Sequence, residues 1–447
     1  MNLSNEFLDA IKCSLKEDYN DYKASLDSEA FRGLRVNLLK ASPEKLKSLL
    51  VFDLEKTPFC DEGFYISGGI KGLGNHPLHH AGAFYLQEPS AMSAVSALDV
   101  KRGDRVLDLC AAPGGKSTQI ASRLAGEGLL WSNEIVGSRA KILAQNIERC
   151  GVRNVVVSSC SPDKLCEKLS GYFDKVLVDA PCSGEGMIRR EPAAISEWSY
   201  QNRISCATRQ LKILDSADLA LKSGGEMVYS TCTLSGEENE MVIDAFLKSH
   251  PNYILLDIEK EFGRAGYNHF ETENDMSKTR RILPQDSGEG HFVAKLKKTS
   301  GNMSVLSNYV YAPVKNPDFD KFISDNFEGV FGIPHQMGDS ILLLPKDLPD
   351  MRGLHIISAG VLCGQCVKNR FVPSHSLYAA SDKSSLKNYI DMSLNDERLA
   401  KYLHGEEIPS DASGYTAVLV EGIPLGFGKA SNGVLKNHYP KGLRTIG

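Results

Sequence analysis

The stretch RVLDLCAAPGGKS (105–117) decides the fold of this protein. It begins as a short apolar run typical of a buried strand, passes through a turn with paired glycines, and continues into the helical pattern KSTQIASRLAG. A strand, a glycine turn and a helix in this order are typical of a βαβ unit whose turn approaches a ligand closely. The stretch therefore predicts a parallel sheet wrapped by helices.

The middle third of the chain repeats this alternation. Further strand-like runs are GLLWSNE (128–134), NVVVSSC (154–160), DKVLVDAPC (174–182) and GEMVYSTC (225–232). Between them lie the helical patterns VGSRAKILAQNIERCG (136–151), with Gly151 as its cap, and residues 195–223. We expect a doubly wound α/β sheet, completed by an edge hairpin from NYILLDIE (252–259) and GHFVAKLKK (290–298).

The two ends of the chain show weaker patterns. The first 80 residues contain one clear strand-like phrase, LRVNLLK (34–40), and predict a small α+β module. Residues 299–303 have the composition of a linker, and the short strands and turns beyond them predict a compact, mostly β domain. We therefore expect three domains, at residues 1–80, 81–300 and 304–447.

Composition limits the class of protein. Of the 447 residues, 42% are hydrophobic and 24% charged, as in soluble globular proteins. The chain lacks an apolar run of about 18 residues and a secretion signal at its start, so we expect a cytoplasmic protein without a membrane partner. The eleven cysteines are expected to be reduced thiols. We also expect a monomer.

The net charge of −5 provides no general attraction to a polyanion, so contact with nucleic acid would need local basic patches. The candidates are Lys278, Arg280 and Arg281; Lys295, Lys297 and Lys298; and Lys429, Lys436, Lys441 and Arg444. Each patch taken alone is also compatible with ordinary solvated surface.

The turn after the first strand predicts a cofactor site, because ligands of open α/β sheets lie beyond the carboxyl ends of the strands. Gly114 and Gly115 would allow a ligand near the backbone N–H groups, and Glu134 at the end of the next strand could accept both hydroxyls of a ribose. The spaced glycine motif that binds a dinucleotide is absent here, and the P-loop motif lacks its first glycine. S-adenosyl-methionine fits the same geometry without phosphates.

Two thiols at neighbouring strand ends suggest the reaction. A buried cysteine alone is as often a core residue, but Cys182 and Cys232 accompany Asp179. Methylation of cytosine at carbon 5 needs a thiolate that adds to carbon 6, a hydrogen-bonding acid at N3, and a base that removes the carbon 5 proton. These three residues could supply that chemistry, with Lys116 or the cofactor's sulfonium favouring the thiolate. Spacing alone leaves open which cysteine attacks.

Three motifs resemble the Sun/RsmF group of RNA cytosine-5 methyltransferases. They are LCAAPGGKS (109–117), DAPCSGEGMIRR (179–190) and STCTLSGEENE (230–240). YLQEPSAM (85–92), RILPQDSGEGHFVA (281–294) and KNHYPKGLR (436–444) are similar to the RsmF-type ribosomal RNA enzymes in particular. The resemblance covers nearly the whole chain beyond residue 30. It implies a Rossmann-like class I methyltransferase core with a PUA-like RNA-binding domain after it.

The same resemblance assigns the site residues. It implies that Cys232 is the nucleophile and that Cys182 assists product release. S-adenosyl-methionine would be held by Cys110, Ala111, Ala112, Pro113, Gly114, Gly115, Lys116, Glu134 and Asp179. Many relatives place an Asp beside the adenine, where this chain has Ser161, which could still hydrogen-bond the base edge.

The substrate expected from the resemblance is RNA, most of all 16S ribosomal RNA. Transfer RNA as substrate and a noncatalytic ribosome-assembly factor stay open as alternatives, although a binding protein has no need of two strand-end thiols. We expect Tyr85, Phe292 and Arg189 to hold the flipped base. Cys363 and Cys366 form a C-x-x-C without a second ligand pair, so no metal is expected.

Overall fold

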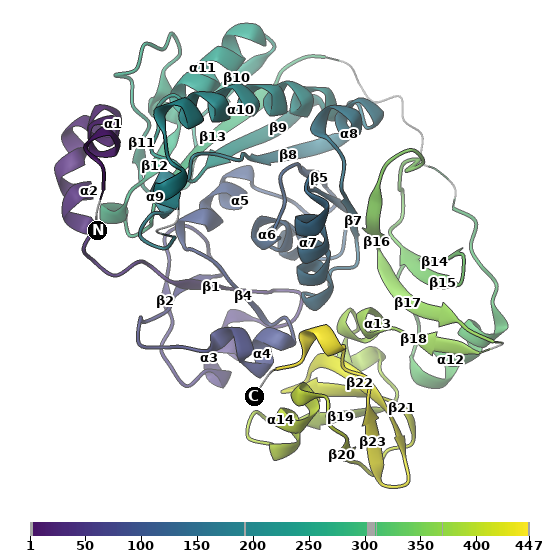
Figure 1. Ribbon diagram of the computed structural model, residues 1–447. Coiled ribbons are helices and arrows are strands. Elements are labelled where there is room, and N and C mark those ends of the chain that lie inside the picture. Colours follow the sequence, from purple (N-terminus) through teal and green to yellow (C-terminus); the bar gives the residue numbers. More distant parts are fainter. Residues whose placement is uncertain (1–2, 192–193, 302–308, 310, 369, 446–447) are drawn as a thin grey trace.

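The computed structural model describes residues 3–191, 194–301, 309, 311–368 and 370–445. Its largest sheet lies at the centre of the molecule (Figure 1). In spatial order the strands are β11 (Arg264–Ala265), β12 (Arg280–Ile282), β13 (His291–Lys298), β9 (Leu221–Thr231), β8 (Phe173–Asp179), β5 (Arg105–Asp108), β6 (Leu129–Asn133), β7 (Val155–Ser158) and β16 (Ile356–Ala359). β10 (Tyr253–Leu256) pairs with the far half of β13. The predicted linker at 299–303 lies partly outside the described residues.

The strands β5 to β9 run parallel, which confirms the doubly wound α/β core. β13 pairs antiparallel with both β9 and β10, as the predicted hairpin requires. It is not an edge strand, however, because β12 covers its first half. Its first residue, His291, is thereby enclosed between strands.

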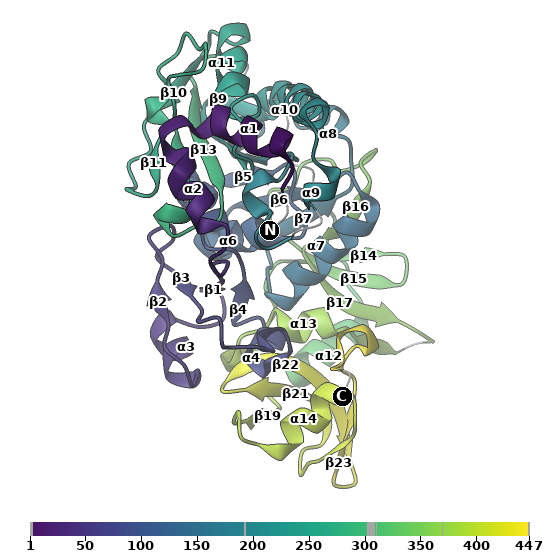
Figure 2. The ribbon, with the colours of Figure 1, turned by 60° about the vertical axis from the view of Figure 1, so that its left-hand side comes forward.

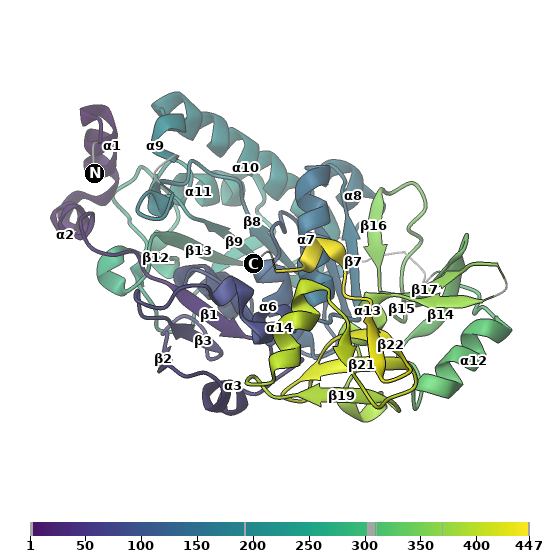
Figure 3. The same ribbon diagram turned by 60° about the horizontal axis from the view of Figure 1, so that its bottom comes forward.

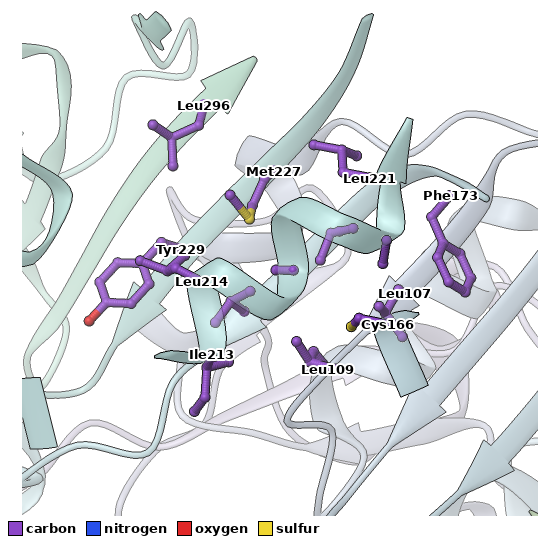
Figure 4. Packing of buried hydrophobic residues seen from close by; sticks show 14 of the residues in the cluster. Leu107, Leu109, Cys166, Phe173, Ile213, Leu214, Leu221, Met227, Tyr229 and Leu296 are labelled. Atoms are coloured by element: carbon purple, nitrogen blue, oxygen red, sulfur yellow. The ribbon is translucent and has the colours of Figure 1, made fainter. Parts of the chain in front are cut away.

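Helices cover both faces of this sheet (Figure 1). One face carries α8 (Pro162–Lys168), α10 (Tyr200–Ala220) and α11 (Glu240–Ser249); the other carries α5 (Ser93–Leu98), α6 (Gly115–Leu124) and α7 (Gly137–Arg149). Successive strand residues point to opposite faces, so Leu107 joins the first core and Val106 the second. Figure 4 shows the first core, where Leu214 and Met227 pack together. Each such leucine stabilises the fold by about 1.5–3 kcal/mol.

The N-terminal region contributes two separate pieces. A small sheet, in the order β2 (Glu55–Lys56), β3 (Gly63–Tyr65), β1 (Gly33–Val36) and β4 (Phe84–Leu86), packs with α3 (Pro43–Leu49) and α4 (Pro77–His80). The helices α1 (Asn5–Leu15) and α2 (Tyr19–Ser25) lie apart from it, beside the central sheet (Figure 2). There the ring of Phe7 packs edge-on against Trp198, which follows the short helix α9 (Ala194–Glu197). The small N-terminal sheet also extends beyond residue 80, because its strand β4 lies at residues 84–86.

The strand predicted at 34–40 ends early, at Val36. The reason is Asn37, whose side-chain amide donates to the carbonyls of Gly82 and Cys150. Lys40 N then donates to the Asn37 carbonyl, which closes a turn. Leu39 N donates to the Asn37 Oδ1 at 3.2 Å, and a side chain that binds a backbone group two residues away competes with strand pairing.

The C-terminal region contains two further sheets. One is β14 (Ile333–Met337), β15 (Ser340–Leu344), β17 (Val361–Cys366) and β18 (Phe371–Pro373), with α12 (Pro317–Asn326) against it; the other is β19 (Tyr389–Met392), β21 (Gly414–Val420), β22 (Ile423–Ser431), β23 (Val434–Asn437) and β20 (Ile408–Pro409). The helices α13 (His375–Ala379) and α14 (Glu397–His404) accompany them. The second sheet shares a hydrophobic core with the N-terminal sheet, and Figure 3 shows them side by side.

One strand departs from the expected division. β16 was expected to belong to the C-terminal β domain, but it pairs antiparallel with β7 of the central sheet. Without it, β7 would present a row of free backbone groups at an exposed edge. Among the described residues, no helix combines the length and apolar character needed to cross a bilayer.

Candidate active site

Two sulfur atoms meet at the carboxyl edge of the central sheet. The Sγ atoms of Cys182 and Cys232 lie 3.4 Å apart, within hydrogen-bonding distance for sulfur, and both thiols are free and partly buried. Cys232 directly follows β9, and Cys182 comes three residues after β8, its parallel neighbour. Their positions at strand ends agree with the sequence pattern. The structure shows that their side chains face each other.

Asp179 forms an ion pair beside the thiols. Its Oδ2 accepts a hydrogen bond from Lys116 Nζ at 2.7 Å and its Oδ1 accepts one from Ser230 Oγ at 2.8 Å. Burial alone would raise the pKa of this carboxyl, but the Lys116 ammonium outweighs burial and holds that pKa below its ordinary value. For Lys116, burial is likewise outweighed by Asp179, so its pKa is raised. The pair is therefore an ammonium and a carboxylate.

His291 is a site residue that the sequence analysis missed. It is buried at the start of β13, and its Nε2 lies 4.0 Å from Asp179 Oδ1. Burial, followed by repulsion from Lys116, lowers its pKa to about 3, so the imidazole is neutral. Within the described part of the chain, Nε2 has no hydrogen-bond partner. A histidine placed directly before the apolar run FVA (292–294) at the start of β13 was the signal for it.

The glycine turn is positioned by residues from the N-terminal sheet. Gly114 caps α6 with a φ of 113°, a conformation that side chains other than glycine rarely adopt. A Cβ atom on Gly115 would lie 3.3 Å from the ring of Tyr85, so that ring would have to shift by a few tenths of an ångström to admit one. The fully buried Arg35 donates to the Gly115 carbonyl at 2.9 Å. The turn therefore depends on β1 and β4 as well as on the central sheet.

Beneath this turn lies a second residue that the sequence analysis did not identify, Asp108. Its Oδ2 accepts from Ser117 Oγ at 2.7 Å, whereas its buried Oδ1 has no hydrogen-bond partner among the described residues. Burial raises its pKa to about 7. The neighbouring Cys110 thiol also has its pKa raised, first by burial and then by Asp108, Asp179 and Glu134. These three carboxyl groups thus surround one spot at the sheet edge.

The remaining cofactor candidates lie at the ends of the next two strands. Glu134 is buried just beyond β6, where Oε1 accepts from Val136 N at 3.0 Å and Oε2 lies 3.5 Å from Arg139 Nη1. Ser161 is partly buried and precedes α8, and its hydroxyl makes no capping bond to that helix. The strand order β7, β6, β5, β8 brings these residues, the glycine turn and Asp179 to the same edge.

The three residues expected to hold the flipped base have no exposed ring or guanidinium surface on which a base could stack. Tyr85 and Phe292 are buried, and Arg189 is buried in a double hydrogen bond with Glu289, at 2.9 and 2.8 Å. Those expectations are wrong, because the arrangement of the strands and of the N-terminal module encloses all three. One member of each of two basic patches is enclosed as well: Arg281 and Lys298 are buried, whereas Lys278, Arg280, Lys295 and Lys297 are partly exposed.

Cys363 is buried in β17, and Cys366 accepts a hydrogen bond from Asn316 Nδ2 at 3.2 Å. The described residues contain no cluster of three His, Cys, Asp or Glu side chains suited to a metal ion.

Comparison with protein families gives four consecutive matches. They are "16S rRNA methyltransferase RsmB/F" at residues 95–297, "N-terminal domain of 16S rRNA methyltransferase RsmF" at 3–89, "RsmF rRNA methyltransferase first C-terminal domain" at 318–380 and "Methyltransferase RsmF PUA domain" at 389–445. The resemblance drawn from the motifs is therefore confirmed, as is the fold class.

Curated relatives match over nearly their whole length. The ribosomal RNA small subunit methyltransferase F of Vibrio campbellii is 32% identical over 98% of this chain and 96% of its own, and that of Escherichia coli O157:H7 has the same identity and coverage. Among solved structures, a methyltransferase homologue from Pyrococcus horikoshii is 30% identical with a TM-score of 0.58, covering 66% of this chain and 100% of its own. NSun6 from the same organism has a TM-score of 0.60 at 24% identity, covering 67% and 99%, and shares the fold.

Proposed function

This chain belongs to the RsmF family of ribosomal RNA methyltransferases, and from that premise we propose that it methylates carbon 5 of a cytosine in 16S ribosomal RNA with S-adenosyl-methionine. The observation that carries the proposal is the 3.4 Å approach of two free thiols next to the Lys116–Asp179 pair. A protein that only binds RNA has no use for this arrangement.

The two thiols have unequal roles in the free enzyme. The contact with Cys232, followed by burial, raises the pKa of Cys182 well above its ordinary value. Cys182 therefore keeps its proton and can donate a hydrogen bond to the Cys232 sulfur across the 3.4 Å contact. The Lys116 ammonium places a positive charge near the same sulfur, and both features suit Cys232 to the role of nucleophile. We assign the attack on carbon 6 to Cys232 for this reason.

The Lys116–Asp179 pair serves the ring nitrogen. When Cys232 Sγ bonds to carbon 6, electron density moves onto N3, which must then receive a hydrogen bond or a proton. Asp179 is ionised, so the proton of the pair resides on Lys116 and reaches N3 from that ammonium, directly or through Asp179. The carboxylate can also accept from the exocyclic amino group, which orients the ring.

Product release falls to Cys182. S-adenosyl-methionine, held at the glycine turn, would supply an electrophilic methyl group for carbon 5 of the adduct. Once Cys232 Sγ is bonded to carbon 6, it no longer raises the pKa of Cys182 as a free thiol does. Cys182 can then ionise and take the carbon 5 proton, so that the bond between Cys232 and carbon 6 breaks.

The cofactor residues proposed from the sequence fit S-adenosyl-methionine. The backbone of Cys110 to Lys116 would lie against its methionine part, where the free acceptor Asp108 Oδ1 suits an ammonium group. Glu134 would accept from the ribose hydroxyls, and Ser161 would face the adenine edge. Both lie just beyond the ends of strands, Glu134 after β6 and Ser161 after β7, and these strands come next to β5 in the sheet.

The remaining domains would hold the RNA. Flipping a cytosine out of its stack costs on the order of a few kcal/mol, and binding by the regions 1–80 and 304–447 on either side of the catalytic region 81–300 can offset this cost. The family match to an RsmF PUA domain at 389–445 supports RNA binding there.

Two alanine variants test the cysteine roles. We expect Cys232→Ala to abolish methyl transfer without any adduct, and Cys182→Ala to accumulate a covalent RNA adduct that migrates slowly on a denaturing gel. Cys13→Ala, at an exposed cysteine, is the matched control and should behave as wild type. An adduct formed by Cys232→Ala instead would reverse the assignment.

The substrate needs a separate experiment. Bisulfite mapping of cellular RNA with and without the gene should show the loss of a 5-methylcytosine in 16S ribosomal RNA. Loss confined to transfer RNA would refute the ribosomal substrate while leaving the reaction intact.

A further inference from the structure

A buried carboxyl group, Glu238, joins the two loops that carry the cysteines. It lies in the turn before α11 with 0% of its surface exposed. Its Oε2 accepts from Ser183 N and from Gln210 Nε2, both at 3.0 Å, and its Oε1 lies 2.5 Å from Ser183 Oγ. Ser183 follows Cys182, and its hydroxyl also contacts Thr233, the residue after Cys232. Glu238 is therefore hydrogen-bonded to the residue that follows Cys182 and is linked through it to the residue that follows Cys232.

The hydrogen atoms in this cluster can be counted. Three oxygen pairs are in close contact: Glu238 Oε1 with Ser183 Oγ at 2.5 Å, Ser183 Oγ with Thr233 Oγ1 at 2.8 Å, and Thr233 Oγ1 with Glu185 Oε2 at 3.0 Å. Each contact needs one hydrogen, but the two hydroxyls supply only two. With both carboxyls ionised, one pair of buried oxygens would face each other through lone pairs. The third hydrogen must reside on a carboxyl group at one end of the row.

The two ends differ in their surroundings. Glu185 Oε1 accepts from Trp198 Nε1 at 2.7 Å and lies 3.4 Å from the guanidinium of Arg203. A buried carboxylate is favoured where a cation and a donor balance its charge. Glu238 has only neutral donors, and no ion pair to a lysine or arginine is formed by it among the described residues. The third hydrogen therefore belongs on Glu238 Oε1.

We propose that Glu238 is a positioning residue that works in its neutral, protonated form and donates through Ser183 and Thr233 to Glu185, so that Glu238 itself adds no negative charge behind the two thiols. This inference rests on the proposed function. A charged Glu238 would oppose the thiolate that the reaction needs, and it would break the row of hydrogen bonds that fixes the two cysteine loops relative to each other.

The electrostatics of the cluster agree with the hydrogen count. Burial, joined by repulsion from Glu185, raises the pKa of Glu238 to about 7, although the bonds from Ser183 and Gln210 lower it. Glu238 in turn contributes to the raised pKa of Cys182. The titratable and charged groups that face the cluster are Cys182 and Glu185 after β8, Arg203 and Cys206 on α10, Tyr229 on β9, and Glu237 next in the chain.

Glu238→Gln tests the proposal, because an amide imitates the protonated carboxyl and stays neutral at every pH. The readout is the rate at which iodoacetamide alkylates Cys182 and Cys232, followed by peptide mass spectrometry, which does not depend on methyl transfer. We expect equal rates for E238Q and wild type at pH 6. At pH 8, where wild type carries the Glu238 charge, E238Q should react about three- to tenfold faster, corresponding to half to one unit of thiol pKa.

Methyl transfer provides the second readout. E238Q should retain activity within about threefold at pH 6 and lose less of it above pH 7 than wild type, whereas Glu238→Ala should lose more than about tenfold at both values because the loops lose their link. Glu237→Gln, at the neighbouring carboxylate that pairs with Arg203, is the matched control and should keep the wild-type pH profile. E238Q that alkylates more slowly at pH 6, or matches wild type at pH 8, overturns the proposal.

If no variant transfers methyl groups but the alkylation rates behave as described, the proposed function fails and the assignment of the proton stands.

Discussion

Among the described residues of the catalytic region, the ion pair with the least exposed side chains joins Arg281 to Glu240. Their side chains are 1% and 0% exposed. The guanidinium donates to both carboxylate oxygens, at 2.7 and 2.5 Å, and its third nitrogen donates to the Leu234 carbonyl at 2.9 Å. Arg281→Met keeps much of the side-chain volume but leaves the Glu240 carboxylate buried without its cation. It also leaves the Leu234 carbonyl without its donor.

The expected destabilisation follows from these contacts. Removing one partner of a buried ion pair costs about 3–5 kcal/mol, mostly because the remaining charge is uncompensated. For a cooperative unit of about 150–250 residues, each kcal/mol lowers the melting temperature by about 2–4 °C. Arg281→Met should therefore lower the transition of the catalytic region by about 6–20 °C. The double variant Arg281→Met with Glu240→Met should recover a large part of this loss, since it removes both charges.

Differential scanning calorimetry of the full chain gives the transition temperatures. The control is Arg280→Met, at the adjacent and partly exposed arginine, which makes one long bond to the Ile258 carbonyl at 3.4 Å and should shift the transition by less than about 3 °C. If the Arg280 and Arg281 variants lose equal stability, or if the double variant is worse than the sum of its parts, the reasoning about the uncompensated charge is refuted.

Two further predictions concern β13. A Cβ atom on Gly290, the residue before β13, would lie 2.5 Å from the Cα of Gly186, in the short helix that follows Cys182. Gly290→Ala should therefore lower the free energy of unfolding by about 1–3 kcal/mol. It should also reduce methyl transfer by more than about tenfold in single-turnover assays. Gly74→Ala, where a Cβ meets nothing within 4 Å, should change neither, and equal losses in both would contradict the close contact. His291 has a pKa of about 3 in the folded protein against an ordinary value of 6.5, so its contribution to stability is full above pH 6.5 and is lost as the pH falls from there toward 3. The urea midpoint should thus fall less between pH 7.5 and 5 in His291→Gln than in wild type or in His404→Gln, at an exposed histidine; identical falls in all three would rule this out.

Much of the active site could be predicted because it depends on local pattern. Short apolar runs identified the parallel strands, and ligands of such sheets gather at their carboxyl ends. Asp179, Cys182 and Cys232 could therefore be placed at one edge without coordinates. The raised pKa of the Cys182 thiol could not, because it follows first from a 3.4 Å contact with Cys232, 50 positions away in the sequence.

The basic patches show where this reasoning fails. Arg281 is a charged residue within a polar stretch, and such residues are almost never fully buried unless they are paired. Its partner Glu240 lies 41 residues away, and the two meet because β12 packs beside β13 above the start of α11. The side chains of Arg189 and Glu289, which are 100 residues apart in the sequence, are likewise brought together by the tertiary fold.

The sequence by itself determined the sheet, its glycine turn and the strand-end residues, since periods of two and 3.6 residues and the chemistry of turns act over short distances. Only the tertiary structure decided that β16 completes the edge of that sheet, that His291 faces Asp179, and that Glu238 connects the two cysteine loops. Those relations depend on which distant side chains share a desolvated volume. There, the free energy of burying a polar group depends on the partner that folding brings to it.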